Sequence, residues 1–148
     1  MQQTQQTTAP VQNSFWAGFH DGVPIGLGYL SVSVTFGMMA VTAGLPVWAA
    51  VAISMTNVTS AGQFAGLSLI FGGGTLFETA LTQFVINLRY ALMSLSLSQK
   101  LERRVGLIDR MLFSFMMTDE VFAVASGQKG EVGKRYLFGV MIAPYCGW

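Results

Sequence analysis

Three ionisable side chains stand inside otherwise apolar stretches of this sequence: Arg89, Asp119 and Glu120. An ionisable group at membrane depth costs roughly 2.5–3.5 kcal/mol on insertion scales, so its presence calls for a partner or a function. We expect Arg89 to pair across helices with Asp119 or Glu120. The pair could be static and fix helix packing, or it could form a gate in which one carboxylate binds a coupling proton.

A second group is polar but uncharged, and it lies in the middle of the apolar stretch 45–71. Its candidate site residues are Asn57, Thr59, Ser60 and Gln63. If the helix unwinds there, freed backbone groups and these side chains can bind a zwitterionic substrate or an ion, as broken helices do in transporters. If it stays continuous, the hydroxyls bond to their own helix and the amides join neighbouring helices. Both interpretations remain open, and Asn87 is a further candidate for the charged groups of a substrate.

Other chemistry finds little support. Cys146 and His20 are each the single residue of their type, so neither a thiolate cluster nor a histidine-rich metal site can form. Motifs of hydrolytic or redox enzymes do not occur. We therefore expect no enzyme activity, no metal and no cofactor.

The composition places the chain in a membrane. Apolar residues make up 52% of the sequence, charged residues 10%, and the mean hydropathy is +0.52. A soluble domain carries about a quarter charged residues, and a short chain needs them to cover its large surface. Part of this surface must therefore face lipid. The net charge of +1 excludes the basic footprint of a nucleic-acid-binding protein.

The predicted fold class is an all-α integral membrane protein: a polytopic helical bundle with broken or re-entrant helices. A disordered polar tail (1–14) precedes the transmembrane domain (15–148), and Asn13 or Ser14 can cap its first helix. The segments are 23–43, 45–71, 75–99, a re-entrant 111–126 and an incomplete 136–148. Pro24, Gly26 and Gly28 should bend or break the first segment. Because the last segment stops short, we expect the chain to be truncated.

Spacing and charge suggest how the segments assemble. Gly18, Gly22 and Gly26 form a small-residue ridge that would admit a close neighbouring helix. The basic loops 100–110 and 127–135 should both be cytoplasmic. Both can be so only if 111–126 enters and leaves on one side, which we favour over a true crossing. Three crossings before the first basic loop would place the uncharged tail outside.

Several motifs together resemble the AzlC family. They are Pro24, Gly26, Gly28-Tyr29 and Phe36-Gly37, the run Thr56–Phe64, the run Ile86–Lys100, and Thr118-Asp119-Glu120. The resemblance covers most of the chain from about Phe15 onward. This chain departs from the family pattern at Ser31, Ser33 and Val58, which bears on substrate identity.

The resemblance implies the large subunit of a branched-chain amino-acid exporter in the inner membrane of bacteria. It also implies a small membrane partner of the AzlD type and export that uses the proton gradient. Two alternatives stay open beside an exporter of valine-, leucine- or isoleucine-like substrates: a non-transporting scaffold or assembly subunit, and a channel. Whether the chain forms a homo-oligomer is also left open.

Overall fold

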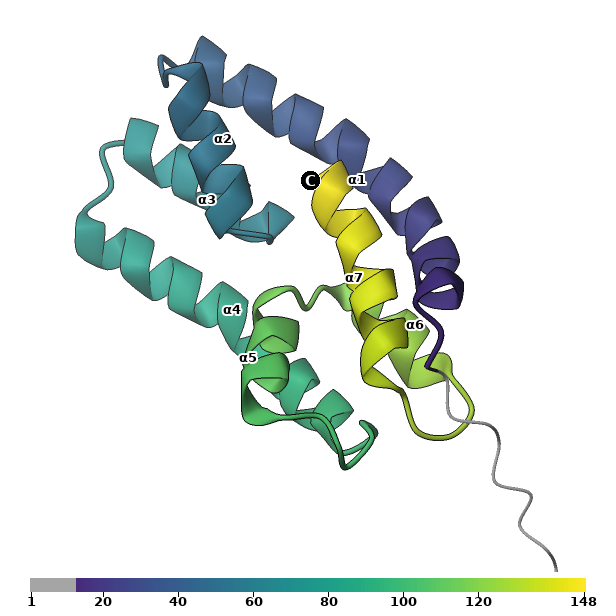
Figure 1. The fold of residues 1–148 in the computed structure, drawn as a ribbon. Helices are drawn as coiled ribbons and strands as arrows, with labels where there is room; N and C mark the ends of the chain where they lie inside the picture. The colour runs from purple at the N-terminus through teal and green to yellow at the C-terminus, as the bar shows by residue number, and fades with distance from the viewer. Residues whose placement is uncertain (1–12) are drawn as a thin grey trace, which may run out of the picture.

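The computed structural model describes residues 13–148, which form seven α-helices and no β-strand. The helices are α1 (Phe15–Thr42), α2 (Val47–Thr56), α3 (Ser60–Phe71), α4 (Leu76–Ser98), α5 (Leu107–Phe115), α6 (Asp119–Gly127) and α7 (Lys134–Gly147). Figure 1 shows that the long helices α1 and α4 frame the shorter ones. The all-α fold class with broken helices is confirmed. The predicted tail lies outside the described residues, except for Asn13 and Ser14.

Helix α1 is longer and more regular than expected. It begins at Phe15, where the Ser14 hydroxyl caps it by accepting from the Ala17 amide at 3.5 Å. Of the bend or break expected at Pro24, the break does not occur, because α1 continues through Pro24 to Thr42. Figure 1 shows a gentle curve along the helix in place of a break. A single proline removes one helical hydrogen bond, which the packed face of a long helix can absorb.

The stretch 45–71 does not cross from one end of the molecule to the other. With 10 and 12 residues, α2 and α3 are each about 15–18 Å long at 1.5 Å per residue, half of what ~30 Å of hydrocarbon requires. After the break α3 turns back: the ring of Phe64 packs edge-on against Phe36, and Phe71 lines the same hollow as Thr42 at the end of α1. The expected crossing is therefore corrected to a hairpin of two short helices (Figure 1).

Helices α5 and α6 form a second such hairpin, with its break at residues 116–118. The loops on either side of it pair through their backbones. The Val132 amide donates to the Lys100 carbonyl at 3.0 Å, and the Glu102 amide donates to the Val132 carbonyl at 3.2 Å. The hairpin thus leaves and returns at one end of the molecule, which is the geometry of a re-entrant element. The basic loops are shorter than expected, because α5 begins at Leu107 and α7 at Lys134.

The end that carries these paired loops, with Arg103, Arg104 and Lys129, is called the basic end below. Helix α1 also starts there, since the Arg135 amide donates to Asn13 Oδ1 at 3.0 Å. The prediction that the N-terminal residues lie on the opposite side from the basic loops is therefore wrong for Asn13. The cause is the α2–α3 hairpin: it leaves two long helices, instead of three crossings, ahead of the first basic loop.

The two halves of the chain share one layout with opposite directions. In each half a long helix is followed by a broken hairpin: α1 by α2–α3, and α4 by α5–α6. The first hairpin enters from the end opposite the basic end, and the second enters from the basic end (Figure 1). Packing repeats as well, because α1 packs on α2, α3 and α6 while α4 packs on α5, α6 and α3. The arrangement is that of an inverted repeat, which many transporter folds contain.

Helix α7 packs along the glycine ridge of α1, parallel to it. A Cβ built at Gly22 would lie 2.5 Å from the Val140 carbonyl oxygen, and one at Gly26 would lie 2.6 Å from that of Ala143. Gly18 meets the backbone of Tyr136 in the same way. The absence of side chains at these three positions is what allows the two backbones to touch.

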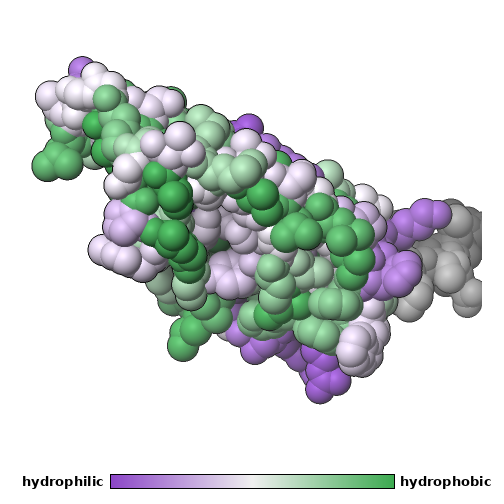
Figure 2. Space-filling model, turned by 90° about the horizontal axis from the view of Figure 1, so that it is seen from above, coloured by the Kyte–Doolittle hydropathy of each residue, from purple (hydrophilic) through white to green (hydrophobic). Residues whose placement is uncertain are grey.

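The surface of the described residues is largely apolar. Helix α1 is the one helix in this range that is both long and apolar enough to cross a membrane, and α2 and α3 are shorter apolar helices. Large hydrophobic side chains on α4 are exposed, among them Phe77, Phe84, Leu92 and Leu95. Figure 2 shows hydrophobic residues across much of one face, with hydrophilic residues gathered mainly toward one end. A lipid-facing surface accounts for this distribution.

Candidate functional site

The break between α2 and α3 is held by side-chain amides. Asn57 ends α2 in an extended conformation, and the Thr59 hydroxyl donates to Asn57 Oδ1 at 2.8 Å. From α4, Gln83 Nε2 donates to the Gly62 carbonyl at 2.7 Å, and Asn57 Nδ2 donates to Gln83 Oε1 at 3.4 Å. A Cβ at Gly62 would collide with these groups. The break is thus an ordered turn that α4 braces.

Gln63 lies at the centre of this turn and is only 2% exposed. Its Nε2 donates to the Asn57 carbonyl at 3.0 Å and to the Ser54 hydroxyl at 3.1 Å. Its Oε1 is buried and has no hydrogen-bond partner among the described residues. A buried acceptor without a donor costs about 1–3 kcal/mol. Of the predicted site residues, Gln63 is therefore the one whose polar chemistry the fold leaves incomplete.

A cavity of about 240 Å³ adjoins the break. The amides of Asn57, Gln63 and Gln83 line one part of it, while aliphatic and aromatic side chains line the rest: Phe36, Ile53, Leu67 and Ile70. Polar groups concentrated beside an apolar wall are the usual make-up of a small-molecule site.

The N-terminus of α3 opens onto this turn. Thr59 is its N-cap residue, yet no side chain caps the helix, and no acidic residue stands in its first turn. Ser60 is the first helical residue and is half-buried. The N–H groups of a helix's first turn have no partners within the helix. They therefore face the break here without a cap.

Asn87 is not part of the break. Its Nδ2 donates to the carbonyl of Gln83, one turn earlier in α4, at 2.8 Å. The side chain that reaches the break from α4 is Gln83, one turn before Asn87, which was not among the candidate site residues. Periodicity gives the face of a helix, but which residue on that face meets α3 depends on how α3 turns back.

The predicted ion pair lies at the second break. Arg89 Nη2 of α4 and Asp119 Oδ2 of α6 are 2.9 Å apart, and Arg89 also donates to the Tyr90 hydroxyl at 2.7 Å. Both side chains of the pair are about half exposed, at 53% and 46%. Asp119 is the first residue of α6, where a negative charge is favoured by the helix dipole. The pair therefore joins α4 to the broken hairpin.

Glu120 makes a different contact. Its Oε2 accepts a hydrogen bond from the hydroxyl of Tyr29, in the middle of α1. The Tyr29 ring packs edge-on against Trp148, the residue after α7, with centroids 4.8 Å apart. The two neighbouring carboxylates of α6 thus have separate partners: Asp119 a cation on α4, and Glu120 a neutral hydroxyl on α1. Thr118, 3% exposed, caps α6 by accepting from the Val121 amide at 3.3 Å.

Sequence reasoning missed Tyr29 as a site residue. Its one signal was a phenol in mid-segment, since a buried tyrosine hydroxyl normally needs a partner. Its partner Glu120 is 91 residues away in the chain, and no spacing rule joins them.

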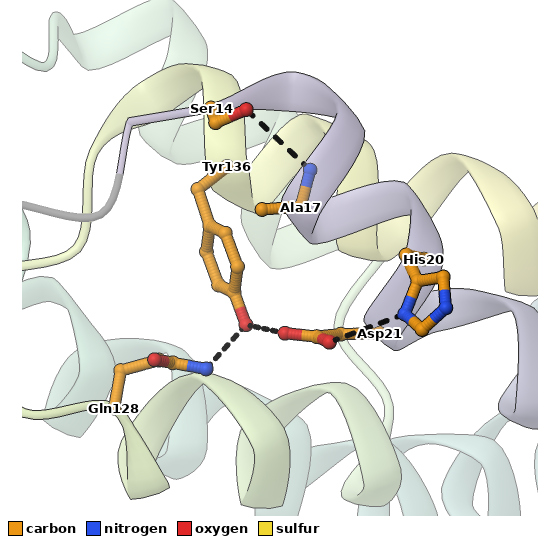
Figure 3. Close-up of polar contacts among 6 residues, drawn as sticks. All are labelled: Ser14, Ala17, His20, Asp21, Gln128 and Tyr136. Carbon is orange, nitrogen blue, oxygen red and sulfur yellow. Dashed lines mark hydrogen bonds and ion pairs between the residues drawn. The ribbon is translucent and has the colours of Figure 1, made fainter.

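A third polar cluster, at the basic end, is structural (Figure 3). The Tyr136 hydroxyl donates to Asp21 Oδ2 at 2.7 Å and accepts from Gln128 Nε2 at 2.5 Å. His20 lies beside Asp21, with 3.9 Å between Nδ1 and Oδ1, and is largely exposed. The cluster ties α1 to α7 and to the end of α6. Within the described residues no group of three or more His, Cys, Asp or Glu side chains could hold a metal ion.

Comparison with known proteins gives one family and several relatives. A family model described as "AzlC protein" matches residues 24–148. "Inner membrane protein YgaZ" of Escherichia coli is 28% identical over 144 residues, which cover 95% of this chain and 59% of that protein. An "Uncharacterized membrane protein" of Archaeoglobus fulgidus is 31% identical over 134 residues, 90% of this chain and 58% of its own length.

The chain thus spans about three-fifths of the length of the curated relatives it matches. No solved structure matches it. The names of the relatives agree with the all-α fold and apolar surface described above: this is a membrane protein.

Proposed function

The chain belongs to the AzlC family, and from this premise we propose that it is a subunit of an amino-acid exporter of the inner membrane. It works by proton-coupled efflux of valine, leucine or isoleucine. The observation that carries the proposal is the meeting of Arg89, Asp119, Glu120 and Tyr29 where α6 begins, at the break that joins α1, α4 and the second hairpin. Charged groups within membrane-spanning helices are retained at a cost when they serve an ion or substrate pathway.

The contacts divide the work between the two carboxylates. Asp119 is paired with the permanent charge of Arg89, and this pair holds α6 against α4. Among residues 13–148 the direct partner of Glu120 is the Tyr29 hydroxyl, which can serve either a charged or a neutral carboxyl group. Glu120 is therefore the carrier of the coupling proton in this proposal. Because Glu120 is hydrogen-bonded to Tyr29, binding or release of that proton changes the contact between α6 and α1.

The first break supplies the substrate side. Its cavity joins amide groups to Phe36, Ile53, Leu67 and Ile70, a wall suited to a branched aliphatic side chain. It lies next to α4, which carries Gln83 at the first break and Arg89 at the second. A single helix thus contacts both the substrate cavity and the proton-carrying hairpin, which gives the two events a mechanical link.

The proposed orientation follows from the basic end. Arg103, Arg104 and Lys129 favour the cytoplasm, so the loops 100–110 and 127–135 are cytoplasmic, and the start of α1 beside them is too. Helix α1 then crosses the membrane, and α4, less apolar than α1 but 23 residues long, crosses with Gln83 and Arg89 turned to the two hairpins. The α2–α3 hairpin enters from outside and the α5–α6 hairpin from the cytoplasm. A hairpin from each side, with its break at depth, suits a pathway that opens alternately to the two sides.

A small membrane subunit of the AzlD type is part of the proposal. The exposed apolar side chains Phe84, Leu92 and Leu95 of α4 support a partner helix or lipid on that face. In the rival interpretation, a scaffold, the glycine ridge would be one of the helix–helix interfaces. That surface is not free for a partner, because α7 of the same chain already covers Gly18, Gly22 and Gly26.

Counterflow of labelled valine tests the proposal, in proteoliposomes that hold the chain with its small subunit. An exporter shows trans-stimulated flux that depends on pH. A channel shows flux without trans-stimulation, and a scaffold shows no flux. Either of the last two results would end the exporter proposal, provided that the reconstituted protein is folded by circular dichroism.

A further inference from the structure

We propose that the N-terminus of α3 binds the carboxylate group of an amino-acid substrate, and that Gln63 Oε1 accepts from its ammonium group. The proposal names the ligand groups recognised at the first break, and it rests on the proposed function for the choice of amino acids as ligands.

In the inverted layout α3 and α6 are counterparts: each is the second helix of a broken hairpin, and each begins after a threonine in extended conformation. The α6 terminus is complete. Thr118 caps it, and two carboxylates of the chain, Asp119 and Glu120, stand in its first turn. The positive end of the helix dipole is thereby satisfied from within the protein.

The α3 terminus has neither feature. The Thr59 hydroxyl donates to Asn57 Oδ1, and the first turn contains no acid. Three first-turn residues, Ser60, Ala61 and Gly62, present backbone N–H groups that lack partners within the helix. The N-terminus of a 12-residue helix with free N–H groups is a suitable binding site for an anion.

Gln63 supplies an independent pointer to a ligand. Its amide is fixed in the break by the bonds of Nε2 to Asn57 and Ser54, which leaves Oε1 of the same amide buried and without a partner. An acceptor next to an anion site fits a ligand that carries its own donor. A zwitterionic amino acid is such a ligand, because its ammonium and carboxylate groups are joined through one carbon.

The adjoining cavity takes the remaining part of the ligand. Its wall of Ile53, Leu67 and Ile70 begins beside the amide of Gln63. A free carboxylate, a free ammonium and an aliphatic side chain thus find matching groups within one site. Valinamide lacks the first of these and 3-methylbutanoate lacks the second, so the pair of analogues separates the two contributions.

Ser60→Pro removes one N–H group from the site with little disturbance. Proline is favoured at the first position of a helix, and the residue before a proline prefers the extended conformation, which Thr59 already has (φ −124°, ψ 113°). Leu76→Pro is the matched control. Leu76 is the first residue of α4, follows Thr75 in extended conformation, and is 90% exposed.

The experiment is equilibrium binding of labelled valine to the purified chain in lipid nanodiscs. Wild type is expected to bind valine, and valinamide should compete at least about tenfold less well. A tenfold loss corresponds to at least one charge-assisted hydrogen bond, which valinamide cannot make without a carboxylate. Ser60→Pro should weaken valine severalfold and leave the weak binding of valinamide unchanged. Gln63→Leu should remove the preference for valine over 3-methylbutanoate. Leu76→Pro should match wild type.

Three results would overturn the proposal: equal competition by valine and valinamide, wild-type affinity in a folded Ser60→Pro, or no binding of valine by wild type. Melting curves of each variant show whether it is folded. The outcome is independent of transport. Binding that follows the expected pattern in a protein without trans-stimulated flux would refute the exporter proposal and leave this site standing.

Discussion

A single methyl group on the glycine ridge should separate α1 from α7. In Gly22→Ala the new Cβ would lie 2.5 Å from the Val140 carbonyl oxygen, about 0.9 Å short of the 3.4 Å at which ordinary contact begins. The atom that it meets is backbone, so no side chain can swing aside and α7 itself must move. Overpacking of this kind costs about 1–3 kcal/mol.

The same helix offers a matched control. Gly28 has nothing within 4 Å of its ideal Cβ, so Gly28→Ala carries only the better helix propensity of alanine, a gain of about 1 kcal/mol. Both variants make the same chemical change in one helix. They should therefore shift stability in opposite directions, or by clearly different amounts if the gain in propensity offsets part of the clash.

Thermal unfolding in detergent micelles, followed by circular dichroism, measures the difference. Gly22→Ala is expected to unfold several degrees below wild type and Gly28→Ala at or above it. Equal midpoints for the two variants would refute the close packing of α1 on α7, and with it the assignment of the ridge.

Three further changes test the polar contacts. Tyr136→Phe removes a buried hydroxyl that donates to Asp21, and it should lower the free energy of unfolding by about 1.5 kcal/mol or more. Tyr145→Phe is the control and should lose less, because the bond of Tyr145 to the Met55 carbonyl is exposed. Equal losses for the two variants would contradict the buried Tyr136–Asp21 bond. Lys134→Met breaks the 2.7 Å ion pair with Asp109 and should lower the free energy of unfolding by about 1 kcal/mol or less. Because salt screens the pair, this loss should be smaller in about 0.5 M salt, and the control Lys129→Met should not show it. Tyr29→Phe keeps the ring against Trp148 and removes the hydroxyl that donates to Glu120, so the pH profile of valine flux should shift while the folded yield stays unchanged. An unchanged pH profile would contradict the proposed coupling of Glu120 to α1 through this hydrogen bond.

Much of the site was accessible from residue types alone. Asn57 and Gln63 are polar groups in an apolar stretch, and their cost in lipid is reason enough to look for a break there. The same argument predicts that Arg89 pairs with Asp119 or Glu120, and the structure contains the pair with Asp119. Local chemistry is what a sequence displays directly, and at these positions local chemistry decided the outcome.

The path of the chain after the break could not be predicted in the same way. Whether the chain continues across or turns back after Asn57 depends on the packing of Phe64 on Phe36, a contact between segments 28 residues apart. Because the chain turns back there, the start of α1 lies at the basic end and not at the opposite end, where the sequence predicted it. The break expected as one alternative at Pro24 does not occur for a related reason: tertiary packing along α1 holds the helix together where propensity alone would end it.

The role of Glu120 is the centre of this account, and proton-driven valine movement tests it most directly. Proteoliposomes holding the chain and its small subunit are given a pH gradient, and uptake of labelled valine against its concentration gradient is followed together with counterflow at equal pH. We predict that Glu120→Gln abolishes the pH-driven accumulation and retains counterflow, while wild type shows both. Undiminished pH-driven accumulation by a folded Glu120→Gln would contradict the assignment of Glu120 as the proton carrier.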